Sequence, residues 1–332
     1  MQYLVDAALQ TKLKYLDNKV HLRGLIEYTN KCEKNCMYCG IRSSNRDVVR
    51  YTVTDDEVLA CAKMAYSMGF GSVAIQTGEC TNDAFTEKIS YFVREIKKLS
   101  NNQLGITLSC GEQPHEVYQQ WFEAGAHRYL LRIEASDEDL YYKIHPHNAK
   151  HDFRRRVESI KDLIAVGYQT GTGVMIGLPF QTLDNLVDDL LLFKNLDVAM
   201  IGMGPFIPHP QTPLWKYRDM IPGATERMNM TLKMIAVARL MMPEINMVAT
   251  TANQTIDAYG REKAILAGAN VIMPNLTPNI YREEYLIYPD KANVHDKPEE
   301  SGVSLEMSIK AINHEIDYNH WGDSVAFTKK QK

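Results

Sequence analysis

The amino-acid sequence predicts an α/β fold, a complete (β/α)8 barrel of the TIM type. Eight short apolar runs alternate with longer stretches of helical periodicity. Glycines stand at equivalent helix-to-strand junctions, at Gly125, Gly167 and Gly268. No glycine-rich dinucleotide turn follows the first strand, which argues against the competing fold, a doubly wound open sheet.

Each predicted strand is a short apolar run bounded by turn or helix signals. Strands that alternate with helices form parallel sheets with right-handed crossovers, and eight such units indicate closure into a barrel. The expected strands are Leu22–Tyr28, Ser72–Gln76, Gly105–Cys110, Arg128–Glu134, Thr170–Gly177, Val198–Gly204, Asn246–Thr251 and Asn270–Asn275.

The helices between these strands carry local start and stop signals. Thr54 and Glu57 form a capping box that begins one helix, and Gly69 ends it. Thr182 begins another helix with one apolar face. We expect residues 1–20 to be a helical lead-in, residues 21–276 the barrel, and residues 277–332 a C-terminal extension that closes the barrel.

Composition excludes several classes of protein. The chain has 332 residues, 45% of them apolar, and a net charge of −4. These values argue against a disordered chain and against a nucleic-acid binder, which usually has a basic surplus. No apolar run approaches the length of a membrane span and no signal-peptide core is present, so we expect a cytoplasmic protein without a membrane partner.

Several predicted strands carry polar residues at alternate positions, although a covered parallel sheet should be continuously apolar. Charged groups inside such a sheet are costly unless they are paired or solvated by a ligand. In a barrel they would line the C-terminal mouth, where active sites lie, although a set of structural ion pairs is the alternative. These positions are Arg23, Glu27, Gln76, Thr107, Ser109, Arg132, Glu134, Thr250 and Thr251.

Three cysteines, Cys32, Cys36 and Cys39, lie in the loop directly after the first strand. Their spacing allows three thiolates to meet one metal centre, and three ligands would leave one iron of an iron–sulfur cluster open. A zinc site would need a fourth ligand, and the next cysteine, Cys61, falls within a predicted helix. Zinc binding and three unrelated thiols remain the alternatives.

This cysteine motif resembles that of the radical S-adenosylmethionine (SAM) superfamily, with Cys-x3-Cys-x-aromatic-Cys after the first strand of a βα barrel. The resemblance implies a 4Fe–4S cluster held by Cys32, Cys36 and Cys39, which would be both the metal ligands and the catalytic centre. The open iron would bind the amino and carboxylate groups of SAM. One electron would then cleave SAM to methionine and a 5′-deoxyadenosyl radical.

Longer segments resemble the HydE family, the radical SAM maturases of iron–iron hydrogenase. Gly-Pro-Phe-Ile-Pro-His-Pro and Met-Pro-Asn-Leu-Thr-Pro are the most specific of them. The resemblance extends over roughly residues 20 to 290 and runs through segments 23–30, 36–42, 76–79, 202–210, 249–252 and 269–278. Members with extra C-terminal cysteines bind a second cluster, whereas this chain has no cysteine after Cys110.

The resemblance also implies a SAM pocket. The carboxylate of Glu79 would complement the SAM ammonium, and the guanidinium forks of Arg132 and Arg156 suit a carboxylate. A solvated turn at Glu79 and a solvated helix face at Arg156 are the alternatives. By resemblance, the cofactor-binding residues are Tyr38, Thr77, Gly78, Glu79, Thr107, Ser109, Arg132, Glu134 and Arg156.

On the substrate side, the resemblance implies a small organometallic iron–cysteine complex that carries CO and cyanide. It also implies contacts with other hydrogenase maturation proteins and with an electron donor. Residues from both halves of the barrel would surround the substrate, because a radical needs an enclosed site. The substrate-binding residues would be Arg23, Gln76, Met203, Thr250, Thr251, Tyr281 and Arg282.

The sequence leaves two rival functions open. One is a radical SAM mutase of the methylornithine synthase type, which would act on lysine. The other is a non-catalytic iron–sulfur scaffold, which would need the cysteines but not Glu79, Arg132 and Glu134. Cleavage of SAM separates the scaffold from both enzymes.

Overall fold

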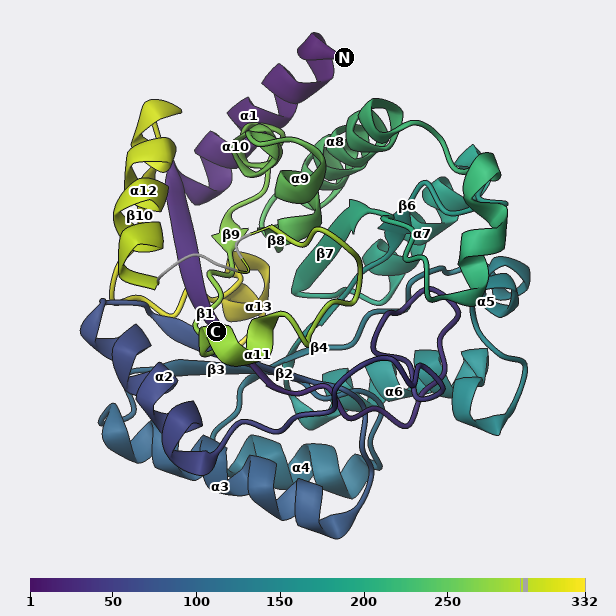
Figure 1. The fold of residues 1–332 in the computed structure, drawn as a ribbon. Helices are drawn as coiled ribbons and strands as arrows, with labels where there is room; N and C mark the ends of the chain where they lie inside the picture. Colours follow the sequence, from purple (N-terminus) through teal and green to yellow (C-terminus); the bar gives the residue numbers. More distant parts are fainter. Residues whose placement is uncertain (293, 295–297, 332) are drawn as a thin grey trace.

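The computed structural model describes residues 1–292, 294 and 298–331. Eight parallel strands form a sheet in the order β1-β2-β3-β4-β5-β7-β8-β9, and pairing of β9 with β1 closes it into a barrel (Figure 1). The predicted barrel is therefore confirmed. Its strands are β1 Lys19–Thr29, β2 Ser72–Thr77, β3 Gly105–Ser109, β4 Arg128–Leu130, β5 Gln169–Thr172, β7 Met200–Pro205, β8 Asn246–Ala249 and β9 Val271–Ile272.

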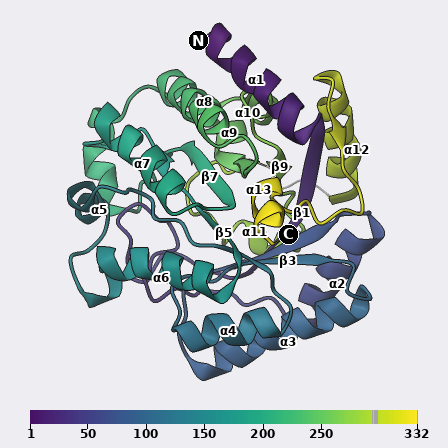
Figure 2. The same ribbon diagram turned by 180° about the vertical axis from the view of Figure 1, so that it is seen from behind.

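Helices surround this sheet (Figures 1 and 2). The capping box at Thr54 is present, and α6 ends where Gly167 adopts a φ of 106°. None of the helices in the described part of the chain has the length and hydrophobicity of a membrane span. The helices are α1 Gln2–Leu16, α2 Asp55–Ser67, α3 Asp83–Leu99, α4 His115–Glu123, α5 Glu138–Ile144, α6 Phe153–Val166, α7 Leu183–Asn195, α8 Ala224–Met241, α9 Thr251–Ile256, α10 Gly260–Leu266, α11 Asn279–Arg282, α12 Pro298–Ala311 and α13 Val325–Lys330.

Five strands, β3, β4, β5, β8 and β9, end earlier than the sequence predicts, and β4 and β5 differ most. The chain leaves β4 after Leu130 and makes one further parallel bridge, between Glu134 and Val174, where Glu134 adopts a left-handed φ of 68°. The expected strand Thr170–Gly177 divides into β5 and a short β6, Met175–Ile176, which pairs with β7. Both irregularities lie at the C-terminal ends of their strands.

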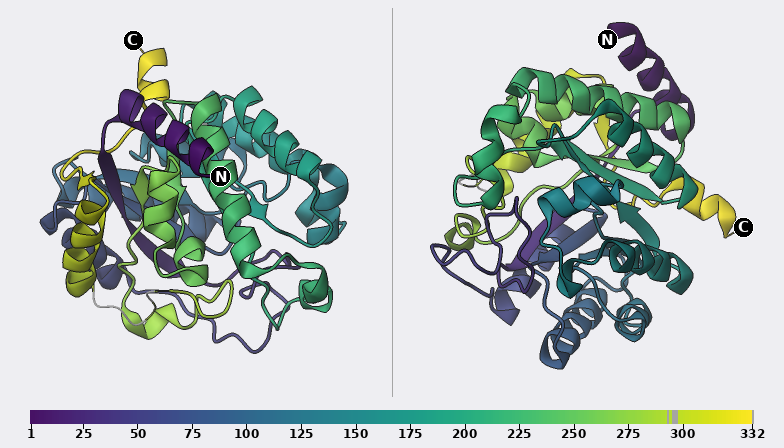
Figure 3. Two further views of the ribbon diagram at one scale, coloured as in Figure 1. Left: turned by 90° about the horizontal axis from the view of Figure 1, so that it is seen from above. Right: turned by 90° about the vertical axis from the view of Figure 1, so that its right-hand side faces the viewer.

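The two ends of the barrel are closed by different parts of the chain. The loop that follows β1 lies at the C-terminal mouth together with α11, whereas α13 lies at the opposite end (Figure 3). There the strand β10, Glu315–Ile316, pairs with the start of β1. The carbonyl of Gly322 accepts hydrogen bonds from Arg23 and Asn246, so the C-terminal tail covers the floor of the barrel. The proposed domain limits at residues 20 and 276 stay predictions.

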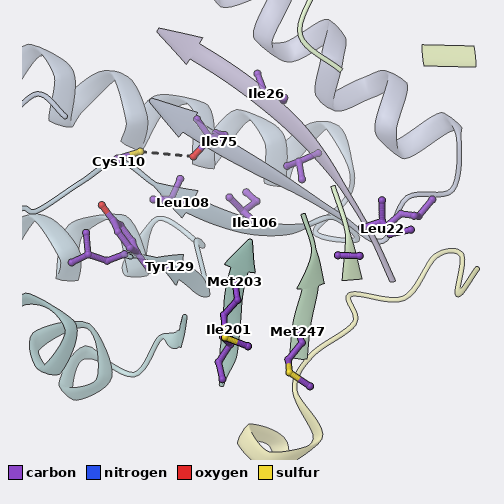
Figure 4. Close-up of a cluster of buried hydrophobic side chains, with 14 of the residues drawn as sticks. Leu22, Ile26, Ile75, Ile106, Leu108, Cys110, Tyr129, Ile201, Met203 and Met247 are labelled. Carbon is purple, nitrogen blue, oxygen red and sulfur yellow. Dashed lines mark hydrogen bonds between the residues drawn. The ribbon is translucent and has the colours of Figure 1, made fainter. Parts of the chain in front are cut away.

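Side chains on the outer face of the strands form the apolar layer between sheet and helices (Figure 4). Ile26, Ile75 and Ile201 belong to this layer and are fully buried. A smaller apolar cluster of Met200, Val248 and Val271 is separate from it. Because successive strand residues face opposite sides, β7, β8 and β9 each contribute to both regions.

Candidate active site

A cavity of about 330 Å³ lies at the C-terminal mouth of the barrel. Its wall includes the loop after β1, the ends of β2 and β8, and the segment after α11. Its lining combines apolar side chains, among them Leu25, Leu130 and Val248, with charged and polar ones. This is the position at which barrel enzymes place their active sites.

Cys32, Cys36 and Cys39 all line this cavity. Burial raises the pKa of the Cys36 thiol to about 12, and the neighbouring Cys32 thiol adds to the effect. Burial likewise raises the pKa of Cys39, with further contributions from Cys36 and Cys32, so the three thiols interact. The backbone N–H of Glu79 donates to the Cys32 sulfur at 3.4 Å. Such thiols become thiolates when a metal replaces their protons.

The three thiols face one cavity. In the part of the chain that the structure describes, no group of three or more His, Cys, Asp and Glu side chains lies close enough together to hold one metal ion, the three cysteines included. Three thiols around a cavity suit the larger body of an iron–sulfur cluster. The backbone of Gly78 packs so closely that a Cβ there would lie 2.1 Å from the Lys31 carbonyl oxygen. The end of β2 is thereby held against the start of the cysteine loop.

A network of two carboxylates and two cations stands beside the cysteines. Lys34 Nζ lies 3.0 Å from Glu79 and 2.9 Å from Glu112. Arg156 Nε lies 2.5 Å from Glu112, and its Nη2 lies 4.0 Å from Glu79. Burial raises the pKa of Glu79, and the charges of Arg156 and Lys34 oppose that rise. The pairing balances four buried charges that would each be costly alone.

Lys34 and Glu112 are members of this network that the sequence reasoning missed. Lys34 lies within the cysteine motif, between Cys32 and Cys36. Glu112 follows Gly111 just beyond β3, in the same way that Glu79 follows Gly78 just beyond β2. This repeated Gly-Glu pair at neighbouring strand ends is the signal that could have found Glu112.

Arg132 and Glu134 also line the cavity, and their side chains form an ion pair of 3.0 Å. Arg132 Nη2 donates a second bond to the Val174 carbonyl at 2.8 Å. Burial raises the pKa of Glu134, and the charge of Arg132 opposes it. The left-handed backbone at Glu134 is costly for a residue with a side chain, and such strain is concentrated at functional sites.

The other wall holds polar residues from widely separated parts of the chain. Gln76 Nε2 donates to the Tyr285 hydroxyl at 3.3 Å. Glu27 forms a buried ion pair with Lys291 and accepts from Asn275 Nδ2 at 2.9 Å. The sequence did not predict three residues of this wall, Tyr285, Tyr288 and Lys291, all of which line the cavity. No local pattern connects them to the first strands.

Most of the expected site residues therefore meet at one cavity. Besides the three cysteines, those that line it are Tyr38, Gln76, Thr77, Gly78, Glu79, Ser109, Arg132, Glu134, Arg156, Thr250 and Thr251. The five exceptions, Arg23, Thr107, Met203, Tyr281 and Arg282, are absent from its lining.

Three exceptions lie on strands. Arg23 shares a face with Glu27 but is four residues nearer the floor, roughly 13 Å along the strand, where it donates to Gly322. Thr107 is buried two residues below Ser109, roughly 7 Å deeper. Met203 faces outward into the apolar layer, as Figure 4 shows, and its neighbour Gly202 lines the cavity instead. The expected substrate-side placement of Arg23 and Met203 is corrected accordingly.

The other two exceptions follow β9. The Tyr281 ring stacks on Tyr51 with centroids 5.0 Å apart, and its hydroxyl donates to Glu57 at 2.9 Å. Arg282 is buried and donates to the carbonyls of Thr277 at 2.6 Å and Asn275 at 3.0 Å. Both side chains fix the turn of α11 against the barrel rather than reach into the cavity.

Comparison with known proteins gives this cavity a family. The family model described as the radical SAM superfamily matches residues 26–193, slightly more than half of the chain, including the cysteine loop. The chain belongs to the radical SAM superfamily. The expected enzyme class, a radical SAM enzyme that cleaves SAM, is thereby confirmed. Membership implies a 4Fe–4S cluster and SAM as cofactors.

Two relatives within the superfamily differ clearly in their similarity to this chain. The "[FeFe] hydrogenase maturase subunit HydE" of Thermotoga maritima is 44% identical over 299 residues, which cover 89% of this chain and 81% of that protein. A "3-methylornithine synthase" of Methanosarcina acetivorans is 26% identical over 275 residues, which cover 82% and 74%. The expected resemblance to the HydE family is confirmed.

A solved structure supports the fold. The crystal structure of methylornithine synthase (PylB) superposes with a TM-score of 0.78 at 22% identity and covers 96% of this chain and 89% of that one. At this level of identity the likeness concerns the barrel alone.

Proposed function

We propose that this enzyme matures the active-site cluster of iron–iron hydrogenase, as the HydE relative does. The observation that carries the proposal is one cavity whose lining joins three thiols, the Lys34, Glu79 and Arg156 members of the carboxylate–cation network, and polar residues of the opposite wall. Identity of 44% to the HydE relative, against 26% to the methylornithine synthase, supports this reading over a lysine mutase.

In this proposal Cys32, Cys36 and Cys39 hold the 4Fe–4S cluster and leave one iron open. When bound, the cluster and SAM supply a 5′-deoxyadenosyl radical. The three thiols are partly buried at the cavity wall, and the N–H of Glu79 directs a hydrogen bond at the Cys32 sulfur.

The SAM side of the cavity would use charge complementarity. Glu79 would accept the SAM ammonium, and Arg156 or Arg132 would bind its carboxylate. Glu134, held by Arg132, would accept ribose hydroxyls. By resemblance, Tyr38 stands near the adenine, while Thr77, Gly78 and Ser109 shape the wall.

The opposite wall would hold the substrate, a small iron–cysteine complex that carries CO and cyanide. Gln76, Thr250 and Thr251 offer hydrogen bonds to it. The pair of Glu27 and Lys291 offers one charge of each sign, which suits the amino and carboxylate groups of a cysteine ligand. Enclosure would direct the radical to the substrate sulfur and away from other targets.

The proposal also includes partners that the cavity does not define. An electron donor would reduce the cluster, and other hydrogenase maturation proteins would supply the substrate and receive the product. The cytoplasmic location expected from the lack of a membrane-length apolar run and of a signal-peptide core stays a prediction.

The test is anaerobic reconstitution with iron and sulfide, followed by SAM, dithionite and a synthetic iron–cysteine complex with CO and cyanide. We expect 5′-deoxyadenosine to form, and to form faster with this complex than with lysine. The Cys36→Ala variant should form none and should bind little iron. Preference for lysine would favour the mutase, and iron binding without SAM cleavage would favour the scaffold.

A further inference from the structure

The cysteine loop is tied along its length to one segment of the chain, Ile144–His151, here called the bracket segment. It connects α5 to α6 and ends in a short 3-10 helix, Ala149–His151. The backbone N–H of Met37 donates to the Ile144 carbonyl at 3.0 Å, and Lys34 Nζ donates to the Lys150 carbonyl. Cys36 lies between these two ties and lines the cavity.

His151 makes the third tie. It is buried, and its Nε2 accepts the backbone N–H of Asn35 at 2.8 Å. Its Nδ1 lies 2.9 Å from Asn148 Oδ1 and therefore carries the proton that is donated there. Burial lowers the pKa of His151 to about 4, with Lys34 adding to the effect, so the ring is neutral and Nε2 is free to accept.

His145 makes the fourth tie in the same manner. Its Nδ1 lies 3.0 Å from the Tyr141 carbonyl and donates to it, which leaves Nε2 to accept from the Tyr38 hydroxyl at 3.2 Å. The His145 ring is fully buried and stacks on the Tyr141 ring with centroids 4.0 Å apart. Two neutral histidines thus each accept one hydrogen bond from the cysteine loop.

We propose that the bracket segment holds the cysteine loop in its ligand-ready conformation before the cluster binds, with His151 and His145 as positioning residues. A free loop would lose backbone entropy when three thiols gather around one cluster. Hydrogen bonds at residues 34, 35, 37 and 38 remove much of that freedom in advance, which is how preorganised sites gain affinity.

The other side of the loop is held separately. Asn35 Oδ1 accepts from Arg42 Nε at 2.8 Å, and the Leu214 N–H donates to the Met37 carbonyl at 3.0 Å. These contacts explain why loss of one histidine should loosen the loop without unfolding it. They also leave the Asn35 N–H dependent on His151 alone among the described residues.

The test compares His151→Ala with His151→Gln, whose side-chain oxygen can accept the same N–H, and with His147→Ala. His147 is the matched control, because it lies in the same segment but is exposed and, among the described residues, has a ring contact only with Tyr142, with centroids 4.1 Å apart. Hydrogen–deuterium exchange is measured on the apo chain over residues 32–39. After reconstitution, iron loss to a ferrous chelator is followed by absorbance.

We expect His151→Ala to exchange the Asn35 amide about tenfold faster and to release iron about tenfold faster, the size expected for one lost hydrogen bond. His151→Gln should recover most of the amide protection and most of the iron retention, and His147→Ala should match wild type in both measurements. Wild-type exchange and iron retention in His151→Ala would overturn the inference, as would equal effects of His147→Ala. If His151→Ala does not fold, the same measurements are made on Asn148→Ala. Wild-type exchange and iron retention in Asn148→Ala would also overturn the inference.

The inference rests on the proposed cluster site, and the two can fail separately. If the wild-type chain binds no iron, the proposed site fails, whereas exchange of the apo loop still reports on the bracket. If iron binds normally but the loop amides are unprotected in the apo chain, the bracket fails and the cluster site stands.

Discussion

The floor of the barrel provides the sharpest test of how the fold is stabilised. Asp323, in the C-terminal tail, lies 2.7 Å from Arg128 Nη2 and 3.3 Å from His127 Nε2. The Arg128 side chain is only 1% exposed, and Arg23, which is fully buried, stands near enough for the two guanidinium charges to interact. We predict that Asp323→Asn destabilises the protein, because it leaves these buried cations without a nearby carboxylate.

The size of the expected stability loss in Asp323→Asn follows from how deeply the ion pair is buried. Removing one partner of a buried ion pair costs about 3–5 kcal/mol. Asp323 is itself 27% exposed, which favours the lower end, about 3 kcal/mol. An unfolding entropy of about 2.1 cal/mol/K per residue gives about 0.7 kcal/mol/K for 332 residues, so the melting midpoint should fall by about 4 °C.

The assay is thermal unfolding followed by circular dichroism at pH 7. The matched control is Asp197→Asn, which removes the same charge from an exposed pair with Lys330 on the same tail and should shift the midpoint by less than about 1 °C. Equal shifts for the two variants, or no shift for Asp323→Asn, would refute the reasoning that the tail neutralises the floor.

The pH dependence of the stability difference between wild type and Asp323→Asn gives an independent check. Although partial burial opposes it, the hydrogen bond from His127 and the charge of Arg128 hold the pKa of Asp323 well below its ordinary 3.8. A lowered folded pKa contributes stability that is fully present above about pH 4 and is lost as the pH falls through the folded value. The gap between wild type and Asp323→Asn should therefore be constant from pH 5 upward and shrink only below about pH 4.

Three further predictions concern other sites. Burial raises the pKa of Asp189 from 3.8 to about 6, so the stability of the wild-type protein should fall as the pH rises from about 4 to 6. Asp189→Asn should remove this pH dependence and raise the free energy of unfolding at pH 7 by roughly 1–3 kcal/mol, as measured by urea unfolding. A Cβ at Gly202 would meet no atom of the described residues within 4 Å, so Gly202→Leu should fold and keep its iron while its side chain fills the cavity. Substrate turnover should then fall at least tenfold while 5′-deoxyadenosine still forms, as measured by chromatography. Glu112→Gln should leave Arg156 and Lys34 partly uncompensated and weaken SAM binding about tenfold, with iron content unchanged, as measured by titration of the reduced cluster's electron paramagnetic resonance signal.

Local sequence patterns predicted the elements of the fold well. The capping box at Thr54 and the stop at Gly167 are local signals, because cap geometry depends on residues three or four positions apart. The alternation of strands and helices identified the closed barrel, since parallel strands with right-handed crossovers leave few other arrangements. The spacing of Cys32, Cys36 and Cys39 on one loop predicted a shared metal centre, and the structure places all three at one cavity, while their role as ligands stays a prediction.

Only the tertiary structure decided how deep each polar side chain lies and with what it pairs. Arg23 and Glu27 share a face in sequence, yet one reaches the floor and the other the cavity, because periodicity gives the face of a strand but not its depth in the barrel. Lys291 meets Glu27 across 264 positions of chain, and no local pattern encodes that distance. Barrel closure and the path of the C-terminal segment bring such groups together, and burial then makes their pairing obligatory.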